Sequence, residues 1–239
     1  MSGDEAFNPG SNVRPEYLKL PGDLVALARS FGIELPDQYL RDAVVLTFSI
    51  ECLDRLLDAI EASGERARFS AGVMDYLQGR RPGGVCYFTE ELFGWLSRLR
   101  EVVERHQIAQ RFYQIVDELL DNSEQMRTER TATGFVNCAL REGRLMVELL
   151  LLIIGEFTTT RFNDFIRRLS EPANLIDKLR DARRDYAAGE LALKPGLWFR
   201  LCLSCEMFRR VFCLARFCVG NRRLLAWGFR SLVAEVKLV

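Results

Sequence analysis

Apolar residues recur at intervals of three and four along most of this 239-residue chain. This is the spacing of one face of an α-helix. The clearest example runs from Asp42 to Ala62, where seven apolar positions follow the pattern. They are Val44, Val45, Phe48, Cys52, Leu56, Ala59 and Ile60. A half-buried strand would alternate apolar and polar residues, and no segment of any length does so. The pattern therefore predicts an all-helical (all-α) fold.

Turn and capping residues divide this pattern into separate helices. The predicted helical segments, some of which overlap or adjoin one another, cover 16–31, 37–43, 42–62, 70–78, 90–106, 107–121, 134–155, 160–171, 173–188, 197–219 and 221–236. We expect Ser63-Gly64 to end one of them and residues 122–133 to link two others. Residues 1–15 are rich in Gly, Pro, Ser and Asn, which predicts a flexible tail. Residues 16–239 are then expected to form one domain, a single bundle of eight to ten helices.

Composition narrows the classes of function. Basic and acidic residues balance at 33 each, so no net field recruits nucleic acid. His106 is the one histidine, which disfavours a histidine metal site or a catalytic triad. An odd number of cysteines and no signal peptide predict a reduced, cytoplasmic setting. The longest apolar run, 145–155, is interrupted by Glu148 and is shorter than the ~18 residues of a membrane span. Contact with a membrane surface stays open.

The C-terminal segment 197–219 is unusual because it is apolar on most of its faces. Such a helix is either central to the core or covered by another subunit. Cys202 and Cys205 form a CxxC within it, and we interpret them as helix core rather than a redox or zinc site. The pattern leaves a monomer and a homodimer both open.

Three aspartates recur every fourth residue near the middle of the second half of the chain: Asp177, Asp181 and Asp185, with Asn174 three residues earlier. On a helix they share one face, where like charges repel by a few tenths of a kcal/mol per pair. Cations must relieve that repulsion. Neighbouring arginines can do so on a surface helix, and Mg²⁺, which prefers carboxylate oxygen, can do so at a binding site.

A second acidic pair lies about 120 residues earlier. Asp54 and Asp58 form a DxxxD in an otherwise apolar helix, so their face points at least partly inward; an ordinary amphipathic helix is the alternative. Asp117 and Asp121 form another DxxxD, which we interpret as the polar end of a helix. Two acidic helix faces set opposite each other can hold divalent ions, and those ions can bind a diphosphate.

The two aspartate motifs resemble those of the squalene/phytoene synthase group and, more broadly, of class I isoprenoid diphosphate enzymes. DRLLD at 54–58 is similar to the DxxxD of an early helix, and NLIDKLRDARRDYAAGE at 174–190 is similar to the second motif. The interval from Asn174 is one residue shorter here, so Asp177 takes the first acidic role. REGRLMVELLL at 141–151 resembles the pocket-lining helix of that fold, with Gly143 at its kink. The resemblance covers roughly residues 40–235.

This resemblance implies a helical bundle of the isoprenoid synthase type that uses Mg²⁺, as more than one ion. Asp54, Asp58, Asp177 and Asp181 would be the catalytic, metal-binding residues, with Asn174 and Asp185 supporting them. Substrate-binding candidates are Arg184, Arg141, Phe48, Trp198 and Phe208. The arginines would bind diphosphate and the aromatic rings would line a prenyl pocket.

The implied reaction is ionisation of an allylic isoprenoid diphosphate and guidance of the carbocation to a terpene. The short chain favours a pocket for one prenyl substrate, and hence a terpene synthase. Two alternatives stay open. One is a head-to-head prenyl transferase of the squalene or phytoene type. The other is a non-catalytic helical interaction protein whose acidic faces are solvated.

Overall fold

The structure is a computed structural model, and it describes residues 15–81, 87–219 and 224. Its regular elements are all helical, and no strand occurs among these residues, which confirms the all-helical prediction. The elements are α1 (Pro15–Ser30), α2 (Asp37–Asp58), α3 (Ser63–Leu77), α4 (Glu90–Arg105), α5 (Ala109–Thr128), α6 (Ala132–Ile154), the 3₁₀ turn η1 (Gly155–Phe157), α7 (Thr160–Ala187) and α8 (Leu197–Cys218).

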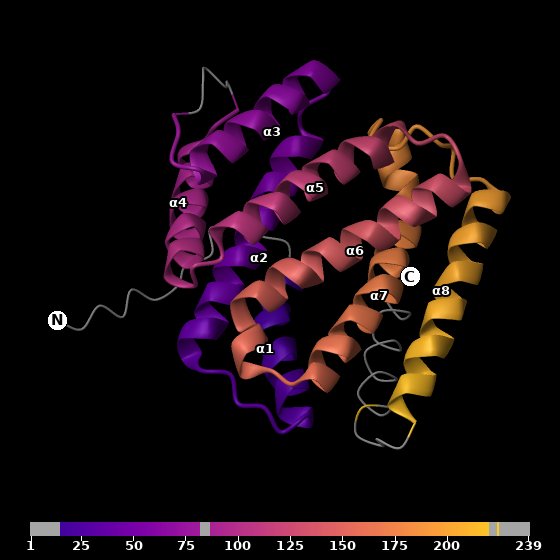
Figure 1. The fold of residues 1–239 in the computed structure, drawn as a ribbon. Helices are drawn as coiled ribbons and strands as arrows, with labels where there is room; N and C mark the ends of the chain where they lie inside the picture. The colour runs from indigo at the N-terminus through magenta and orange to yellow at the C-terminus, as the bar shows by residue number, and fades with distance from the viewer. Residues whose placement is uncertain (1–14, 82–86, 220–223, 225–239) are drawn as a thin grey trace.

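Helix α6 is the centre of the arrangement. It packs against α5 on one side and α7 on the other, and it also contacts α2 and α8. Figure 1 shows α8 at the outer edge of the molecule, alongside α7, and α4 at the opposite edge, while α3 packs against α5. The helices that carry the aspartate motifs, α2 and α7, therefore both pack against α6.

A close approach of α6 and α7 depends on Gly143. A Cβ atom at this position would lie 2.9 Å from the carbonyl oxygen of Ser170 and 3.2 Å from Cβ of Asn174. Both of those residues are on α7, so a larger side chain would push the two helices apart. Helix α6 runs on through Gly143 as one continuous element. The absent side chain thus brings α7 and its aspartates close to the centre of the fold.

Two predicted boundaries on the N-terminal side were wrong. The segments 37–43 and 42–62 form the single helix α2, which ends at Asp58. Ser63-Gly64 does not end that helix but begins α3, so α3 starts seven residues earlier than predicted. Ser and Gly are tolerated at both ends of helices, and their position alone does not say which end is meant.

Two further boundaries were wrong because a core position holds an unexpected residue. Helix α5 continues through the predicted link to Thr128, because Asn122 occupies a core position, fully buried, and donates to the carbonyl of Cys138 at 3.0 Å. Helix α7 is continuous across Pro172, which is buried between the predicted helices 160–171 and 173–188. Proline removes one helical hydrogen bond, and packing of α7 against α6 and α8 outweighs that loss.

Other predictions lie outside the described residues, namely the helix 221–236 and all but the last residue of the N-terminal tail 1–15. Among the helices that are described, none combines the length and the apolar character needed to cross a bilayer.

Candidate functional site

The two aspartate motifs converge on one pocket. Asp54 and Asp58 at the end of α2 line it from one side, and Asp177 and Asp185 of α7 line it from the other. The remaining lining residues are Ser123, Met126, Arg127, Phe135, Glu142, Lys178, Arg184, Glu190 and Leu191. They come from α5, α6, α7 and the segment after α7. We call this site the acidic pocket, because six carboxylate side chains and three basic side chains line it.

Arginines hold the motif aspartates in place. Arg127 of α5 pairs with Asp58. On α7, Arg180 pairs with Asp177 and lies 3.3 Å from Asp181. Arg184 bridges Asp181 and Asp185 at 3.1 and 3.3 Å. The arginine-paired arrangement that the sequence left open is thus present, and the carboxylates also converge on one pocket.

Lys178 is a built-in cation of the acidic pocket. Its ammonium lies 3.0 Å from a carboxylate oxygen of Glu142, and both side chains are largely buried. Burial disfavours its charge, but Glu142 and Asp54 outweigh burial, so the pKa of Lys178 is raised. The lysine therefore carries its charge throughout the neutral range and offsets part of the negative charge around it.

The carboxylates remain in excess despite these cations. Burial raises the pKa of Asp177, and Asp181 adds to the rise against the effect of Arg180. Burial also raises the pKa of Asp185. Burial, Asp58 and Asp185 together raise the pKa of Glu190. Raised carboxyl pKa values mean that the negative charges here are poorly compensated, so an added cation would be favoured.

Two of the predicted metal-binding residues lie beside the pocket rather than in its lining. Asn174 donates to the carbonyl of Ala139 at 2.6 Å and to Glu142 at 2.8 Å. Its amide nitrogen thereby positions Glu142 on α6. Asp181 is held between Arg180 and Arg184, as described above. Four of the six predicted metal ligands thus line the acidic pocket. The other two, Asn174 and Asp181, contact residues next to them instead.

The predicted substrate-binding residues are scattered. Arg184 lines the acidic pocket. Arg141 is exposed and pairs with Glu118 at 3.2 Å. Phe48 is buried and stacks on Trp95 in the main core. Trp198 and Phe208 are exposed on α8, and neither lines the acidic pocket.

Sequence reasoning missed several lining residues. Arg127, Glu142, Lys178 and Glu190 were given no role, although Lys178 and Glu190 stand within the second motif segment and Glu142 within the predicted helix 134–155. Lys178 carries a usable signal, because it stands four residues after Asn174 and therefore on the same face of the helix. Arg127 fell in the predicted link at 122–133 and gave no such signal.

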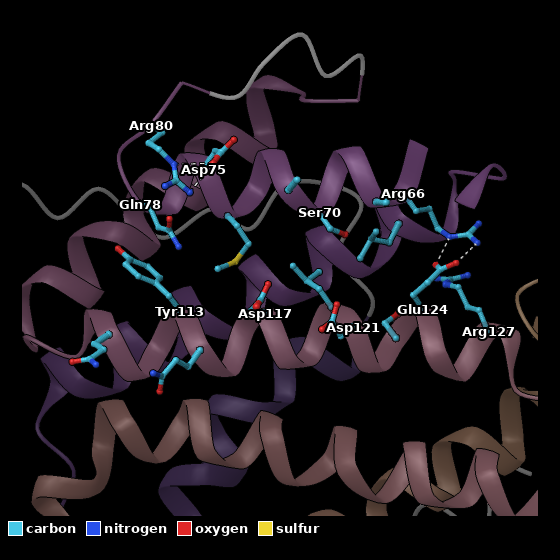
Figure 2. Close-up of a pocket in the computed structure, with 18 residues that line it drawn as sticks. Arg66, Ser70, Asp75, Gln78, Arg80, Tyr113, Asp117, Asp121, Glu124 and Arg127 are labelled. Carbon is cyan, nitrogen blue, oxygen red and sulfur yellow. Dashed lines mark hydrogen bonds and ion pairs between the residues drawn. The ribbon is translucent and has the colours of Figure 1, made fainter. Parts of the chain in front are cut away.

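A larger cavity of about 720 Å³ lies between α3 and α5 (Figure 2). An ion pair closes each end: Arg66 with Glu124 at 2.8 Å, and Arg80 with Asp75 at 2.7 Å. Its other lining residues are Leu57, Ala67, Ser70, Ala71, Met74, Gln78, Gln110, Tyr113, Gln114, Asp117, Leu120, Asp121, Ser123 and Arg127. We call this cavity the α3–α5 groove.

Asp117 and Asp121 point from α5 into the α3–α5 groove (Figure 2). Neither forms a hydrogen bond or ion pair within the described part of the chain. They lie in the middle of α5 rather than at its end, which corrects the prediction, because the helix continues to Thr128. No second aspartate-rich helix faces them, since the one carboxylate of α3 in this lining, Asp75, is held by Arg80.

The donor chemistry of the acidic pocket suits Mg²⁺, which binds carboxylate oxygens and keeps several waters. Asp54, Asp58, Asp177 and Asp185 are the side chains that would hold it. Within the described residues, no three His, Cys, Asp or Glu side chains are already gathered as a metal-binding group. Binding would require Asp58, Asp177 and Asp185 to exchange their arginine partners for the ion.

Comparison with known proteins found no matching family model, no matching curated protein and no matching solved structure.

Proposed function

We propose that this protein is a Mg²⁺-dependent enzyme that ionises an allylic isoprenoid diphosphate, with a terpene as product. The observation that supports the proposal is the convergence of Asp54 and Asp58 with Asp177 and Asp185 on one pocket. These pairs are about 120 residues apart in sequence, and the family resemblance requires them to meet. If the two pairs were simply solvent-facing positions on unrelated helices, they would not need to meet.

The chain's own groups would divide the work as follows. Asp54, Asp58, Asp177 and Asp185 would hold Mg²⁺, which would supply charge to stabilise the leaving diphosphate. Arg127 and Arg184 lie in the same lining and would present fork-shaped donors to phosphate oxygens. In the structure, Arg127 pairs with Asp58, and Arg184 pairs with Asp181 and Asp185. Lys178 adds a third positive charge to the lining of the acidic pocket.

The prenyl chain would occupy the apolar side of the pocket, where Met126, Phe135 and Leu191 line it. Phe135 lies in edge-tilted contact with Phe199, 5.1 Å between ring centroids, within the smaller of the two core clusters. The cavity volume is about 70 Å³. Small-molecule sites usually span about 300–1,000 Å³. Substrate binding therefore requires this apolar side to open.

Turnover tests the proposal directly. The purified full chain would be incubated with Mg²⁺ and the C10, C15 or C20 allylic diphosphate, and released diphosphate and hydrocarbon products would be measured. We expect turnover in the wild type and at least a hundredfold loss in Asp58→Asn and Asp185→Asn. Asp164→Asn is the matched control, because Asp164 is a surface aspartate of α7 near Arg167, and it should keep activity within twofold.

The product would distinguish a terpene synthase from a head-to-head prenyl transferase. A squalene- or phytoene-type product would favour the second. No Mg²⁺-dependent diphosphate release with any of the three substrates would contradict the proposal and favour a non-catalytic helical protein.

A further inference from the structure

Helix α8 carries a second apolar stripe on its outer face. The stripe consists of Trp198, Leu201, Cys205, Phe208, Phe212, Ala215 and Val219, and all seven are exposed. We call it the α8 seam. Phe208 and Phe212 keep 66% and 70% of their surface in solvent, and Trp198 keeps 73%. Cys205 was predicted to be helix core, and the structure instead places it in the middle of this exposed stripe.

The packing of this chain does not account for the α8 seam. The opposite face of α8 already supplies Phe199, Leu203 and Cys218 to the interior, against α6 and α7. One apolar face is enough for a surface helix. A second face of seven consecutive seam positions, none of them charged, indicates a further binding surface.

The spacing of the seam indicates what kind of partner it fits. Its positions step alternately by three and four residues, a mean period of 3.5. That is the heptad spacing of a helix that packs lengthwise against another helix. The seam runs from Trp198 to Val219, about 32 Å at ~1.5 Å per residue. The fitting partner is therefore a second apolar helix of similar length.

We propose that the α8 seam binds the α8 seam of a second copy of this chain, antiparallel, with Phe208 at the two-fold axis. In this register large side chains oppose smaller ones: Phe212 opposes Cys205 of the second copy, and Leu201 opposes Ala215. Trp198 opposes Val219. A parallel pairing would instead set each large ring against its own copy. Two-fold, self-complementary interfaces of this kind are the commonest in homo-oligomers.

The apolar area is close to what a dimer needs. Large aromatic side chains bury ~150–250 Å² each, so the exposed parts of the five largest seam residues amount to roughly 600 Å² per copy. A standard interface buries about 800 Å² per partner. Polar and flanking atoms along a 22-residue helix can supply the difference.

Leu224 lies in the interior and not on the seam. It follows Val219 by five residues and is 1% exposed, within the main core cluster that also contains Cys218. Leu224 therefore does not cover the seam.

Light scattering after size exclusion tests the proposal on the full chain. The wild type should be a dimer at micromolar concentrations. Phe208→Glu and Ala215→Arg place a charge in the seam and should each weaken dimerisation at least a hundredfold, with an unchanged helical circular dichroism spectrum. Ala215 is small and exposed, so its replacement leaves the fold intact. Cys213→Arg is the matched control, because Cys213 is exposed on α8 but off the seam, and it should remain dimeric.

Cysteine crosslinking tests the antiparallel register. In a parent lacking Cys205 and Cys213, Phe208→Cys should crosslink to its own copy through a short bismaleimide, and Trp198→Cys should not. Residue 198 lies ten positions from the axis, so its two copies would be about 30 Å apart. In a parallel dimer both variants would crosslink, which would overturn the register.

Other outcomes would overturn the proposal itself. A wild type that stays monomeric at 100 µM would do so. A dimer that survives both Phe208→Glu and Ala215→Arg would place the interface elsewhere. A monomer that sediments with anionic lipid vesicles, and loses that binding in Phe208→Glu, would make the seam a membrane-binding surface. None of these results depends on diphosphate turnover, so this proposal and the proposed function can fail independently.

Discussion

The acidic pocket and the α3–α5 groove each carry a DxxxD pair, and the two pairs differ in what faces them. Asp54 and Asp58 face two further aspartates of α7, with Arg127, Lys178 and Arg184 among them. Asp117 and Asp121 face α3, whose one carboxylate in the groove is held by an arginine. The two pairs have the same spacing in sequence, but only Asp54 and Asp58 face a second set of aspartates.

The difference shows that helical spacing places carboxylates on a face but does not make a metal site. A site needs a second acidic face across a small gap and a supply of cations to hold both faces in the absence of metal. The acidic pocket meets these conditions in about 70 Å³. The α3–α5 groove is ten times larger and has one acidic face. Cavity size alone would have selected Asp117 and Asp121 instead.

The largest expected effect compares the two DxxxD pairs directly. With Mg²⁺ and inorganic diphosphate at 100 times the dissociation constant, the wild type should gain about 2.7 kcal/mol. That corresponds to roughly 5–10 °C in the melting temperature. Asp54→Asn with Asp58→Asn should abolish the gain, and Asp117→Asn with Asp121→Asn should leave it within about 1 °C of the wild type by these relations. Equal loss in both double variants would remove the distinction between the two regions.

A second comparison concerns the cations. Lys178→Met removes the buried cation beside Glu142 and Asp54 and should lower the free energy of unfolding by about 2 kcal/mol. Arg80→Met removes a cation of the α3–α5 groove whose side chain is 62% exposed, and it should cost less than about 0.5 kcal/mol. Urea denaturation of both variants measures the two changes in the free energy of unfolding. A reversed order would mean that the acidic pocket is more open to solvent than the structure indicates.

The third prediction tests the helix approach that forms the acidic pocket. Gly143→Ala sets a methyl group against the backbone of α7 and should destabilise the protein by about 1–2 kcal/mol. Gly94 lies in α4 with open space around it, so Gly94→Ala should stabilise by about 0.5–1 kcal/mol through helix propensity. Thermal unfolding should show shifts of opposite sign. A stabilising Gly143→Ala would show that α6 and α7 are not in close contact.

The smallest effect lies in the α3–α5 groove and depends on pH. A hydrogen bond from Arg66 lowers the pKa of Glu124 below the ordinary 4.5, although burial opposes the shift. A lowered pKa means that the ion pair stabilises the fold above pH 4.5 and that this stabilisation is lost as the pH falls through the folded-state pKa. Glu124→Gln should therefore cost about 0.5–1 kcal/mol at pH 7, and this cost should shrink as the pH falls below 4.5.

Glu118→Gln is the control for that measurement, because Glu118 is on the same helix and forms an exposed pair with Arg141. Its unfolding free energy should stay close to that of the wild type at both pH values. A constant difference between Glu124→Gln and the wild type from pH 7 to pH 3 would show that the Arg66 pair does not contribute.

Local patterns predicted the elements better than their ends. The spacing of three and four identified α2, α4, α6 and α8, because each buries one continuous apolar face. It failed where a core position is polar, as at Asn122, or where packing carries a helix across a proline, as at Pro172. Local propensity contributes about 1–3 kcal/mol at such positions, which tertiary packing overrides.

In the candidate site, too, local spacing predicted some features and tertiary packing decided the others. The spacing of Asp54 with Asp58 and of Asp177 with Asp185 follows from helix geometry, and sequence alone predicts that each pair shares a face. That the pairs meet, that Asp117 and Asp121 face a different cavity, and that Lys178 and Glu142 join the lining depend on how α2, α5, α6 and α7 pack. Helix spacing is local, with a period of 3.6 residues. Contact between helices that are far apart in sequence depends on single residues such as Gly143, which carry no periodic signal.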